Sequence, residues 1–277
     1  MLSESVVLIG KGLYKTIPDE IKISAVPTAS ELEFVGAEDF DGCMIKTIFP
    51  QVIENSESMD FGELLDIDYD WICRCLRMKS YGPFFTANRI FCPDCNEVHK
   101  GEYQVDLRRV GVNPLPDSFV NKITISADEF IDVKDDFVMQ LPTVRDRLAM
   151  NKDSLFQRKN GGMNVTLARI CYMTKQIGNQ QNLTPVDVRS YIHKNFSSAD
   201  YEILKDLVNQ NDNYGLRFMG QVNCPACGSS NAYFVAYAQD KFFRPSVGDV
   251  RSFKSAIRSG DWKNLPGDPA EYVRLDN

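Results

Sequence analysis

Two short stretches, Cys92-Pro93-Asp94-Cys95 and Cys224-Pro225-Ala226-Cys227, decide how this chain is organised. In each stretch proline follows the first cysteine, and a turn-forming residue, Asn96 or Gly228, follows the second. Residues typical of β-strands flank both stretches. A Cys-x-x-Cys at a tight turn presents two thiolates to one edge of a tetrahedral metal site, so each stretch resembles half of a zinc ribbon. Together they predict one zinc ion with four ligands: Cys92, Cys95, Cys224 and Cys227.

The separation of the two pairs is unusual. Residues 96–223 lie between them, whereas a compact zinc ribbon has about 15–20 residues there. We therefore expect the fold of the intervening chain to bring the two hairpins together. Thiols without metal and a redox pair are the alternatives, although a redox Cys-x-x-Cys usually opens a helix after a strand and neither stretch has that context. Four protein ligands leave no position for water or substrate, so the predicted site is structural.

The remaining cysteines and the two histidines carry weaker signals. Free cysteine commonly packs as a small buried hydrophobic residue. We expect this of the four cysteines in apolar, helix-like stretches, which are Cys43, Cys73, Cys75 and Cys171. His99 follows the first pair by four residues, and we interpret it as a surface residue of the hairpin, with a role as metal ligand as the alternative. His193 lies on a predicted helix without a partner motif, so a solvated or half-buried position is expected.

The amino-acid composition limits the classes of protein to which this chain can belong. The chain has 277 residues, of which 43% are hydrophobic and 25% charged, which is ordinary for a globular protein with a core that needs no disulfides. Its net charge of −7 argues against a broad phosphate-binding surface. No apolar run approaches the roughly 18 residues of a membrane span. The first residues carry an acid and lack the basic region of an export signal, so we expect synthesis in a reducing cytoplasm.

No catalytic motif stands out. The chain lacks the usual signatures of zinc proteases, serine hydrolases and phosphate-binding loops. Gly10-Lys11-Gly12 has neither the third glycine nor the strand–helix context of a dinucleotide loop, and it is interpreted as a turn. Asp132, Asp135 and Asp136 form an acidic cluster without an EF-hand ligand pattern, and a solvated turn is expected there. We therefore predict that the protein is not an enzyme and has no catalytic or cofactor-binding residues.

The pattern of residues predicts an α+β fold, with short strands and helices around a split four-cysteine zinc ribbon. The chain divides into four predicted segments. They are a strand-rich N-terminal segment at 1–36, a helical segment with the first zinc hairpin at 37–142, a helical segment with the second at 143–243, and a C-terminal helix and tail at 244–277.

Capping residues place the helices of the first half. Residues 28–31 have the form of a capping box and predict a helix start. Residues 38–56 are a second helical candidate, disturbed by a proline. Asp66 or Asp68 begins the next helix, which ends at Ser80-Tyr81-Gly82-Pro83 because glycine and proline terminate helices. The first cysteine hairpin follows this helix.

The second half has similar signals. Residues 143–218 are expected to be helical, with a helix start at Thr184-Pro185 and another helix capped by Ser198. A final helix is predicted at Val247–Ser259, and Trp262 is the expected anchor of the tail. The succession of helix, turn and Cys-x-x-Cys hairpin therefore occurs twice, which suggests two related halves that share one metal ion.

Several of these features together resemble a family, the baseplate hub and hub-assembly proteins of contractile-tailed, T4-like bacteriophages. The resemblance covers roughly residues 20–250. It rests first on a helix with Arg74 and Arg77 that ends in Ser80-Tyr81-Gly82-Pro83 and leads into Phe91-Cys92-Pro93-Asp94-Cys95. Three later features fit the same pattern: Leu141-Pro142-Thr143 before Val144-Arg145-Asp146, a helical middle, and Cys224-Pro225-Ala226-Cys227-Gly228 followed by Phe242-Phe243-Arg244-Pro245. The resemblance implies a structural or assembly role with the cysteine pairs as metal ligands. Asn96 departs from the pattern, because glycine is usual there.

The function expected from this resemblance is that of a baseplate component or assembly factor of the virion tail. Its partners would be other phage baseplate and tail proteins and, in the assembled tail, copies of itself, with no nucleic acid. A zinc-ribbon nucleic-acid-binding or transcription accessory protein is the alternative, for which the basic residues near the first hairpin are the nearest support: Arg89, Lys100, Arg108 and Arg109. An unrecognised zinc enzyme is a further alternative. Pro83-Phe84-Phe85 and Phe242-Phe243-Arg244-Pro245 are interpreted either as interface anchors or as core residues beside the hairpins.

Overall fold

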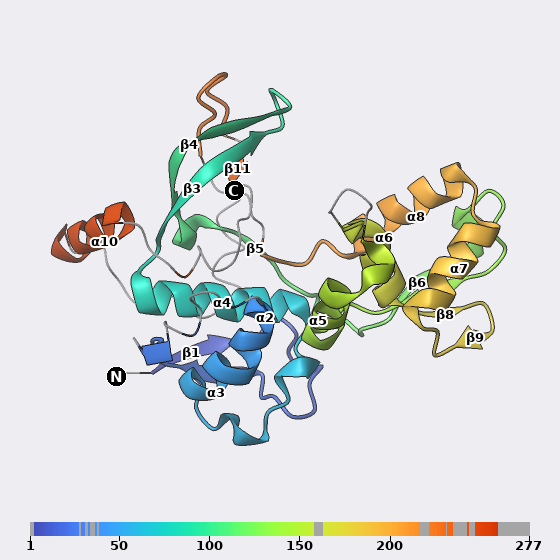
Figure 1. The fold of residues 1–277 in the computed structure, drawn as a ribbon, viewed down its shortest axis with the longest axis horizontal. Helices are drawn as coiled ribbons and strands as arrows, with labels where there is room; N and C mark the ends of the chain where they lie inside the picture. Colours follow the sequence, from blue (N-terminus) through green and yellow to red (C-terminus); the bar gives the residue numbers. More distant parts are fainter. Residues whose placement is uncertain are drawn as a thin grey trace. The chain divides into compact units, whose positions relative to one another are not determined.

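The structure, a computed structural model, shows two compact units of mixed helices and antiparallel strands (Figure 1). It describes residues 3–27, 29–30, 33, 37, 39–157, 163–216, 222–230, 232–234, 243 and 247–259. Unit 1 comprises Met1–Asp60, Ile67–Leu115 and Tyr214–Asn277. Unit 2 comprises Phe61–Asp66 and Pro116–Asn213. No described helix is both long and apolar enough to cross a membrane.

The elements of unit 1 surround one long helix. Its helices are α2 (Phe40–Cys43), the π-helical turn η1 (Met44–Ile48), α3 (Phe49–Val52), α4 (Asp66–Tyr81, whose first residue belongs to unit 2) and α10 (Val247–Ser259). Its strands are β1 (Glu4–Val7), β2 (Glu20–Ile23), β3 (Phe84–Cys92), β4 (Glu97–Asp106), β5 (Val112–Asn113), β10 (Gly215–Leu216) and β11 (Tyr233–Phe234).

In the residues that the structure describes, unit 2 has four helices and a four-stranded sheet. The helices are α5 (Val144–Lys152), α6 (Val165–Met173), α7 (Pro185–Asn195) and α8 (Ser198–Asn211). The strands, in the order β6-β7-β8-β9, are β6 (Ile123–Ile125), β7 (Phe137–Met139), β8 (Thr174–Ile177) and β9 (Gln180–Gln181). Single 3₁₀ turns join elements in both units; they are η2 (Ser56–Ser58), η3 (Phe61–Glu63), η4 (Leu107–Arg109), η5 (Ala127–Glu129) and η6 (Ser154–Phe156).

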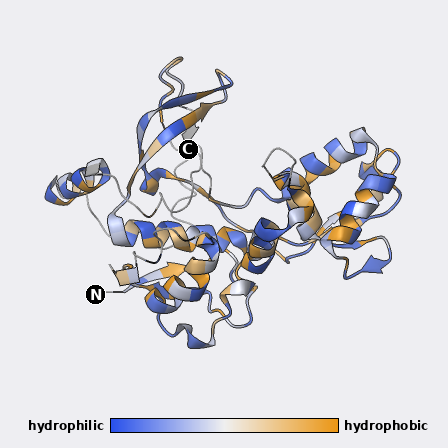
Figure 2. Cartoon of the chain, viewed as in Figure 1, coloured by the Kyte–Doolittle hydropathy of each residue, from blue (hydrophilic) through white to orange (hydrophobic). Residues whose placement is uncertain are grey.

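Helix α4 is buried along almost its whole length, although it carries both hydrophobic and hydrophilic residues (Figure 2). Asp68 is completely buried within the helix, so it is not the cap that the sequence suggested. Its carboxylate accepts hydrogen bonds from the backbone N–H groups of Ile9 (2.6 Å) and Gly10 (2.8 Å). These two bonds stabilise the turn that was predicted at residues 10–12.

The end of α4 requires glycine. Gly82 has a φ of +83°, a left-handed conformation that L side chains rarely adopt. A Cβ atom at this position would also lie 2.6 Å from the ring of Phe253 on α10. Gly82 therefore ends the helix and lets α10 pack closely against the turn.

Two buried arginines of α4 connect the helix to the β3–β4 hairpin. Arg77 donates to the carbonyl oxygens of Gly82 (2.8 Å) and Phe84 (2.7 Å), which form the turn before β3. Arg74 donates through Nε to the carbonyl of Leu107 (3.1 Å), just after β4. The guanidinium groups satisfy backbone acceptors at the open end of the hairpin, where β3 begins and β4 ends, which explains why charged residues occur on a buried helix.

Strands β3 and β4 form a long twisted hairpin in Figure 1, and β11 pairs with the other edge of β3. The register shifts between Ala87 and Arg89, so that two residues of β4, Gly101 and Glu102, lie opposite the single residue Asn88. This β-bulge and the exposed charges of β4 are features that protect an edge strand from pairing with another chain.

The structure confirms several predicted elements and corrects others. The helix at 38–56 is present as α2, η1 and α3, with Pro50 in the first turn of α3. The start at Thr184-Pro185 and the helix Val247–Ser259 are confirmed. The middle of the chain is not entirely helical, since it contains the β8–β9 hairpin. The helix attributed to Ser198 is capped one residue earlier, by the side chain of Ser197.

Two predictions concern residues outside those that the structure describes. The capping box of residues 28–31 has its threonine and glutamate outside the described residues, and so does the expected anchor Trp262.

Candidate metal centre

The first cysteine turn connects β3 to β4. Cys92 is the last residue of β3, and it pairs with Glu97, the first residue of β4. Asn96 closes the turn with a φ of +55°, in the left-handed region that asparagine tolerates better than most residues. Asparagine therefore performs the role of the glycine that is usual at this position.

The second cysteine turn has the same construction. The N–H of Gly228 donates to the carbonyl of Cys224 (2.9 Å), and the N–H of Cys224 donates to the carbonyl of Ser229 (2.7 Å). Gly228 has a φ of +73°, which matches the left-handed residue of the first turn. A bridge between Val222 and Ala232 closes this hairpin behind the turn.

Antiparallel pairing brings the two turns together. Strand β11, which follows the second turn, pairs with the end of β3 in the register Tyr233↔Phe91 and Phe234↔Ile90. The backbone ladder therefore holds Cys224 and Cys227 close to Cys92, although the two turns are far apart in sequence.

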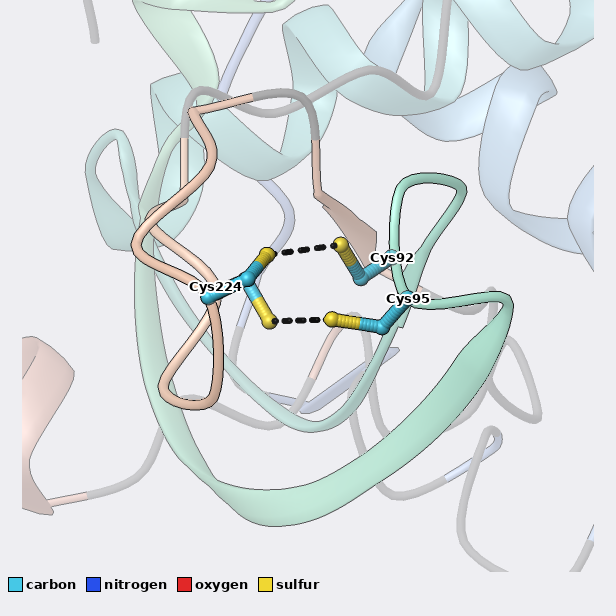
Figure 3. Close-up of side chains that lie close together, drawn as sticks. Cys92, Cys95 and Cys224 are labelled. Carbon is cyan, nitrogen blue, oxygen red and sulfur yellow. Dashed lines mark hydrogen bonds between the residues drawn. The ribbon is translucent and has the colours of Figure 1, made fainter.

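The four sulfur atoms face one another (Figure 3). The distance from Cys92 Sγ to Cys227 Sγ is 3.7 Å, and that from Cys95 Sγ to Cys224 Sγ is also 3.7 Å. All four sulfur atoms lie within 4.8 Å of one another. The four are free thiols, and 3.7 Å is far too long for a disulfide, whose S–S bond measures about 2.05 Å.

The cluster lies at the boundary between core and solvent. Cys92 and Cys224 are buried, Cys95 is half-buried and Cys227 is exposed. The buried pair belongs to a hydrophobic cluster of α4 and the hairpin that includes Met78, Phe85, Ala87, Ile90, Val105, Leu107, Val110 and Ala232. Loss of the cysteine arrangement would therefore disturb the packing of the hairpin against α4.

Backbone N–H groups in the turns stabilise the first thiolate of each pair. The N–H groups of Cys95 and Asp94 lower the pKa of Cys92, but burial and the facing thiols outweigh them and raise it. Burial raises the pKa of Cys224, yet the N–H groups of Cys227 and Ala226 and the thiols of Cys227 and Cys92 lower it to about 6. A hydrogen bond with Cys227, together with burial, raises the pKa of Cys95 well above its ordinary value.

The four sulfur atoms lie close enough for the thiols to compete for ionisation. Thiolates at hydrogen-bond distance repel one another, so a low pKa at one sulfur is accompanied by a high pKa at its neighbour. A bound dication removes this conflict, because a coordinating thiol is deprotonated outright. The arrangement is therefore suited to a metal ion of soft ligand preference.

His99 lies beside this cluster. Its Nε2 atom is 3.4 Å from Cys224 Sγ, and its side chain is half-buried. The sequence suggested a surface residue of the hairpin, and the register that places His99 opposite Ile90 explains why the ring reaches Cys224. The sequence indicates only that His99 lies near the first cysteine pair, because Cys224 belongs to a distant segment.

The other candidate residues have structural surroundings. Cys73, Cys75 and Cys171 are buried as expected, whereas Cys43 is half-exposed. Burial raises the pKa of Cys75 and of Cys171 to about 12, so both are inert thiols at neutral pH. His193 is exposed on α7.

The acidic cluster forms turn contacts. Asp135 accepts a hydrogen bond from the hydroxyl of Tyr191 (2.6 Å), and Asp136 accepts one from the backbone N–H of Ala127 (2.7 Å). Among the residues that the structure describes, the four cysteines form the one group with metal-ligand geometry.

The described aromatic residues of the segments proposed as interface anchors are largely internal, whereas Phe242, Arg244 and Pro245 lie outside the described residues. Phe85 is buried in the cluster around the cysteines. Phe243 is also buried, and its ring centroid lies 5.9 Å from that of Phe40. Phe84 is half-buried under the guanidinium of Arg108. The interpretation as core residues therefore fits Phe85 and Phe243.

Comparison with known proteins agrees with this description. The family model described as T4 bacteriophage base plate protein matches residues 11–244, which include both cysteine pairs, His99 and the buried arginines of α4. No curated protein and no solved structure matches the chain. Because the family match extends over most of the sequence, the chain belongs to the T4 bacteriophage base plate protein family, whose members are located in the tail of the virion.

Proposed function

We propose that this protein is a structural or assembly component of the hub region of the baseplate, which acts by binding other tail proteins and holds one structural zinc ion. The match to the baseplate family over residues 11–244 carries the proposal. The family name describes a part of the particle. In a zinc site the four cysteines would be four protein ligands, which leaves no coordination position for a substrate.

The geometry of the cysteine cluster fits zinc. A tetrahedral site with Zn–S bonds of about 2.3 Å has sulfur–sulfur distances of about 3.8 Å. The two distances of 3.7 Å between facing sulfurs agree with this value. Cys92, Cys95, Cys224 and Cys227 would hold the ion, and it would stabilise the hairpin by linking two distant segments.

Partner binding follows from the role in a baseplate. A subunit of such an assembly functions through protein–protein contacts, and its apolar anchors are usually buried aromatic and arginine residues of the interface. Because Phe85 and Phe243 are used in the core, we place the contact surface outside these two residues.

Mass spectrometry of purified particles from the phage that encodes this chain tests the proposal. A permanent hub component should be present at a fixed copy number relative to other baseplate proteins. An assembly factor should be absent from the particles, yet deletion of its gene should stop baseplate formation. Normal baseplates after deletion, accompanied by altered transcription, would instead support the zinc-ribbon nucleic-acid-binding alternative.

A further inference from the structure

One nitrogen donor accompanies the four sulfurs. His99 Nε2 lies 3.4 Å from Cys224 Sγ, within the range of a hydrogen bond to sulfur. The sequence has only two histidines, and the other, His193, belongs to α7 of unit 2. In a tetrahedral site each of the four cysteines would occupy one corner. His99 therefore distinguishes the corner of Cys224 from the corners of Cys92, Cys95 and Cys227.

The position of His99 is determined by the hairpin. It is the third residue of β4 and lies opposite Ile90, which is completely buried. Ile90 also pairs with Phe234 of β11, the strand that follows the second cysteine turn. The same ladder thus fixes the backbone of His99 and of β11, the strand that follows the turn of Cys224.

We propose that His99 is a reserve metal ligand for the Cys224 corner, and that it takes the place of the Cys224 thiolate when this group is lost. This inference rests on the zinc site proposed above. Three cysteines and one histidine form a standard closed zinc site, with Zn–N bonds of about 2.0–2.1 Å. While Cys224 is bound, the ring N–H donates to its thiolate and offsets part of the negative charge of the four sulfurs.

The difference between corners makes the proposal testable. Cys224→Ala leaves three thiolates with an imidazole beside the empty corner, whereas Cys92→Ala, Cys95→Ala and Cys227→Ala leave three thiolates whose missing corner has no histidine in contact. Each full-length variant is loaded with zinc, dialysed and measured for metal per chain by elemental analysis. Cobalt-loaded samples report through their absorption spectra whether nitrogen has replaced sulfur.

We expect Cys224→Ala to retain about one metal ion per chain with a spectrum of three sulfurs and one nitrogen, and the other three variants to lose theirs. The double variant Cys224→Ala/His99→Ala should also lose its metal. Equal loss in all four single variants, retention in the double variant, or failure of Cys224→Ala alone to fold would each overturn the proposal. A wild-type protein without metal would instead overturn the zinc site itself.

A milder variant supplies an independent measurement. His99→Ala leaves all four cysteines in place, and loss of such a supporting contact typically lowers metal affinity by about 10–100-fold. Transfer of zinc from His99→Ala to a chelator should therefore be faster than transfer from the wild-type protein. His193→Ala is the matched control because it removes the other histidine. Identical transfer rates in the two variants would contradict the proposed contact.

Discussion

The guanidinium of Arg77 lies 3.9 Å from the carboxylate of Asp249, and both side chains are almost completely buried, with 0% and 2% exposure. Asp249 also accepts a hydrogen bond from the hydroxyl of Thr86 (2.6 Å). Burial lowers the pKa of Arg77 to about 10, and Asp249 opposes this shift by favouring the charged form. One carboxylate of α10 thus compensates a buried cation of α4 and also contacts β3.

Replacement of Asp249 by alanine should therefore release α10 and destabilise unit 1. A hydrogen bond to a charged group contributes about 1.5–3 kcal/mol, and we expect a loss of this size in the free energy of unfolding. Urea unfolding followed by circular dichroism measures the loss, and hydrogen exchange of residues 247–259 should increase. Arg258→Ala, an exposed change on the same helix, is the control; equal effects of the two variants would contradict the role of Asp249.

Removal of one of the proposed zinc ligands should affect the whole of unit 1. Cys92→Ser should lose the metal and lower the unfolding midpoint, because Cys92 is a buried member of the hydrophobic cluster around Met78. Elemental analysis and thermal unfolding measure the two effects. Cys43→Ser, a half-exposed cysteine outside the site, should retain metal and midpoint. An unchanged midpoint in Cys92→Ser would show that the site is not structural.

Even the conservative replacement of Arg169, on α6, by lysine should destabilise unit 2. Its guanidinium donates to Asp66 (2.7 Å) and to Asp212 (2.8 Å), two residues from distant parts of unit 2. Lysine lacks the planar fork that serves two carboxylates at once, so we expect Arg169→Lys to cost about 1.5–3 kcal/mol of unfolding free energy. Lys205→Ala, which breaks an ion pair with the exposed Glu202, should cost less than about 1 kcal/mol. Similar values for the two variants would refute this role of Arg169.

Asp200 should make unit 2 sensitive to acid. Burial raises the pKa of Asp200, but hydrogen bonds from the backbone N–H of Ile131 and the hydroxyl of Ser197 outweigh it and hold the pKa below its ordinary value. A lowered native pKa stabilises the fold above the unfolded-state pKa, and this stabilisation disappears as the pH falls through the native value.

Asp200→Asn should therefore be less stable than wild type at pH 7, and the difference should shrink below about pH 4. Urea unfolding of both proteins across this range measures the difference. Asp206→Asn, on the exposed side of the same helix, should stay within about 0.5 kcal/mol of wild type at pH 7. A difference that is constant with pH would exclude ionised Asp200 as its origin.

Local signals in the sequence identified much of this structure. The cap at Thr184 and the glycine after α4 depend on neighbouring residues, so they were recognisable without a fold. The cysteine pairs carry their own turn chemistry, which is why the cluster of four was predictable.

Contacts between distant segments were not predictable in this way. The proximity of His99 to Cys224 depends on the register of β3 with both β4 and β11. The burial of Arg77 depends on a carboxylate from a helix near the other end of the chain. A charged residue on a helix ordinarily indicates a solvent-exposed face, so its burial follows only from tertiary structure.

The position of the two cysteine turns has a consequence in polymer terms. They enclose nearly all of unit 2, and the facing sulfurs of Cys95 and Cys224 are 129 positions apart in sequence. The entropy of closing a flexible loop grows only logarithmically, and a doubling of its length costs about 0.6 kcal/mol. A metal ion held by the four cysteines would therefore close this loop at nearly the same entropic cost whatever the size of the enclosed unit. The closure of this loop therefore sets no strict length for the enclosed unit, whereas the spacing within each cysteine turn must stay constant.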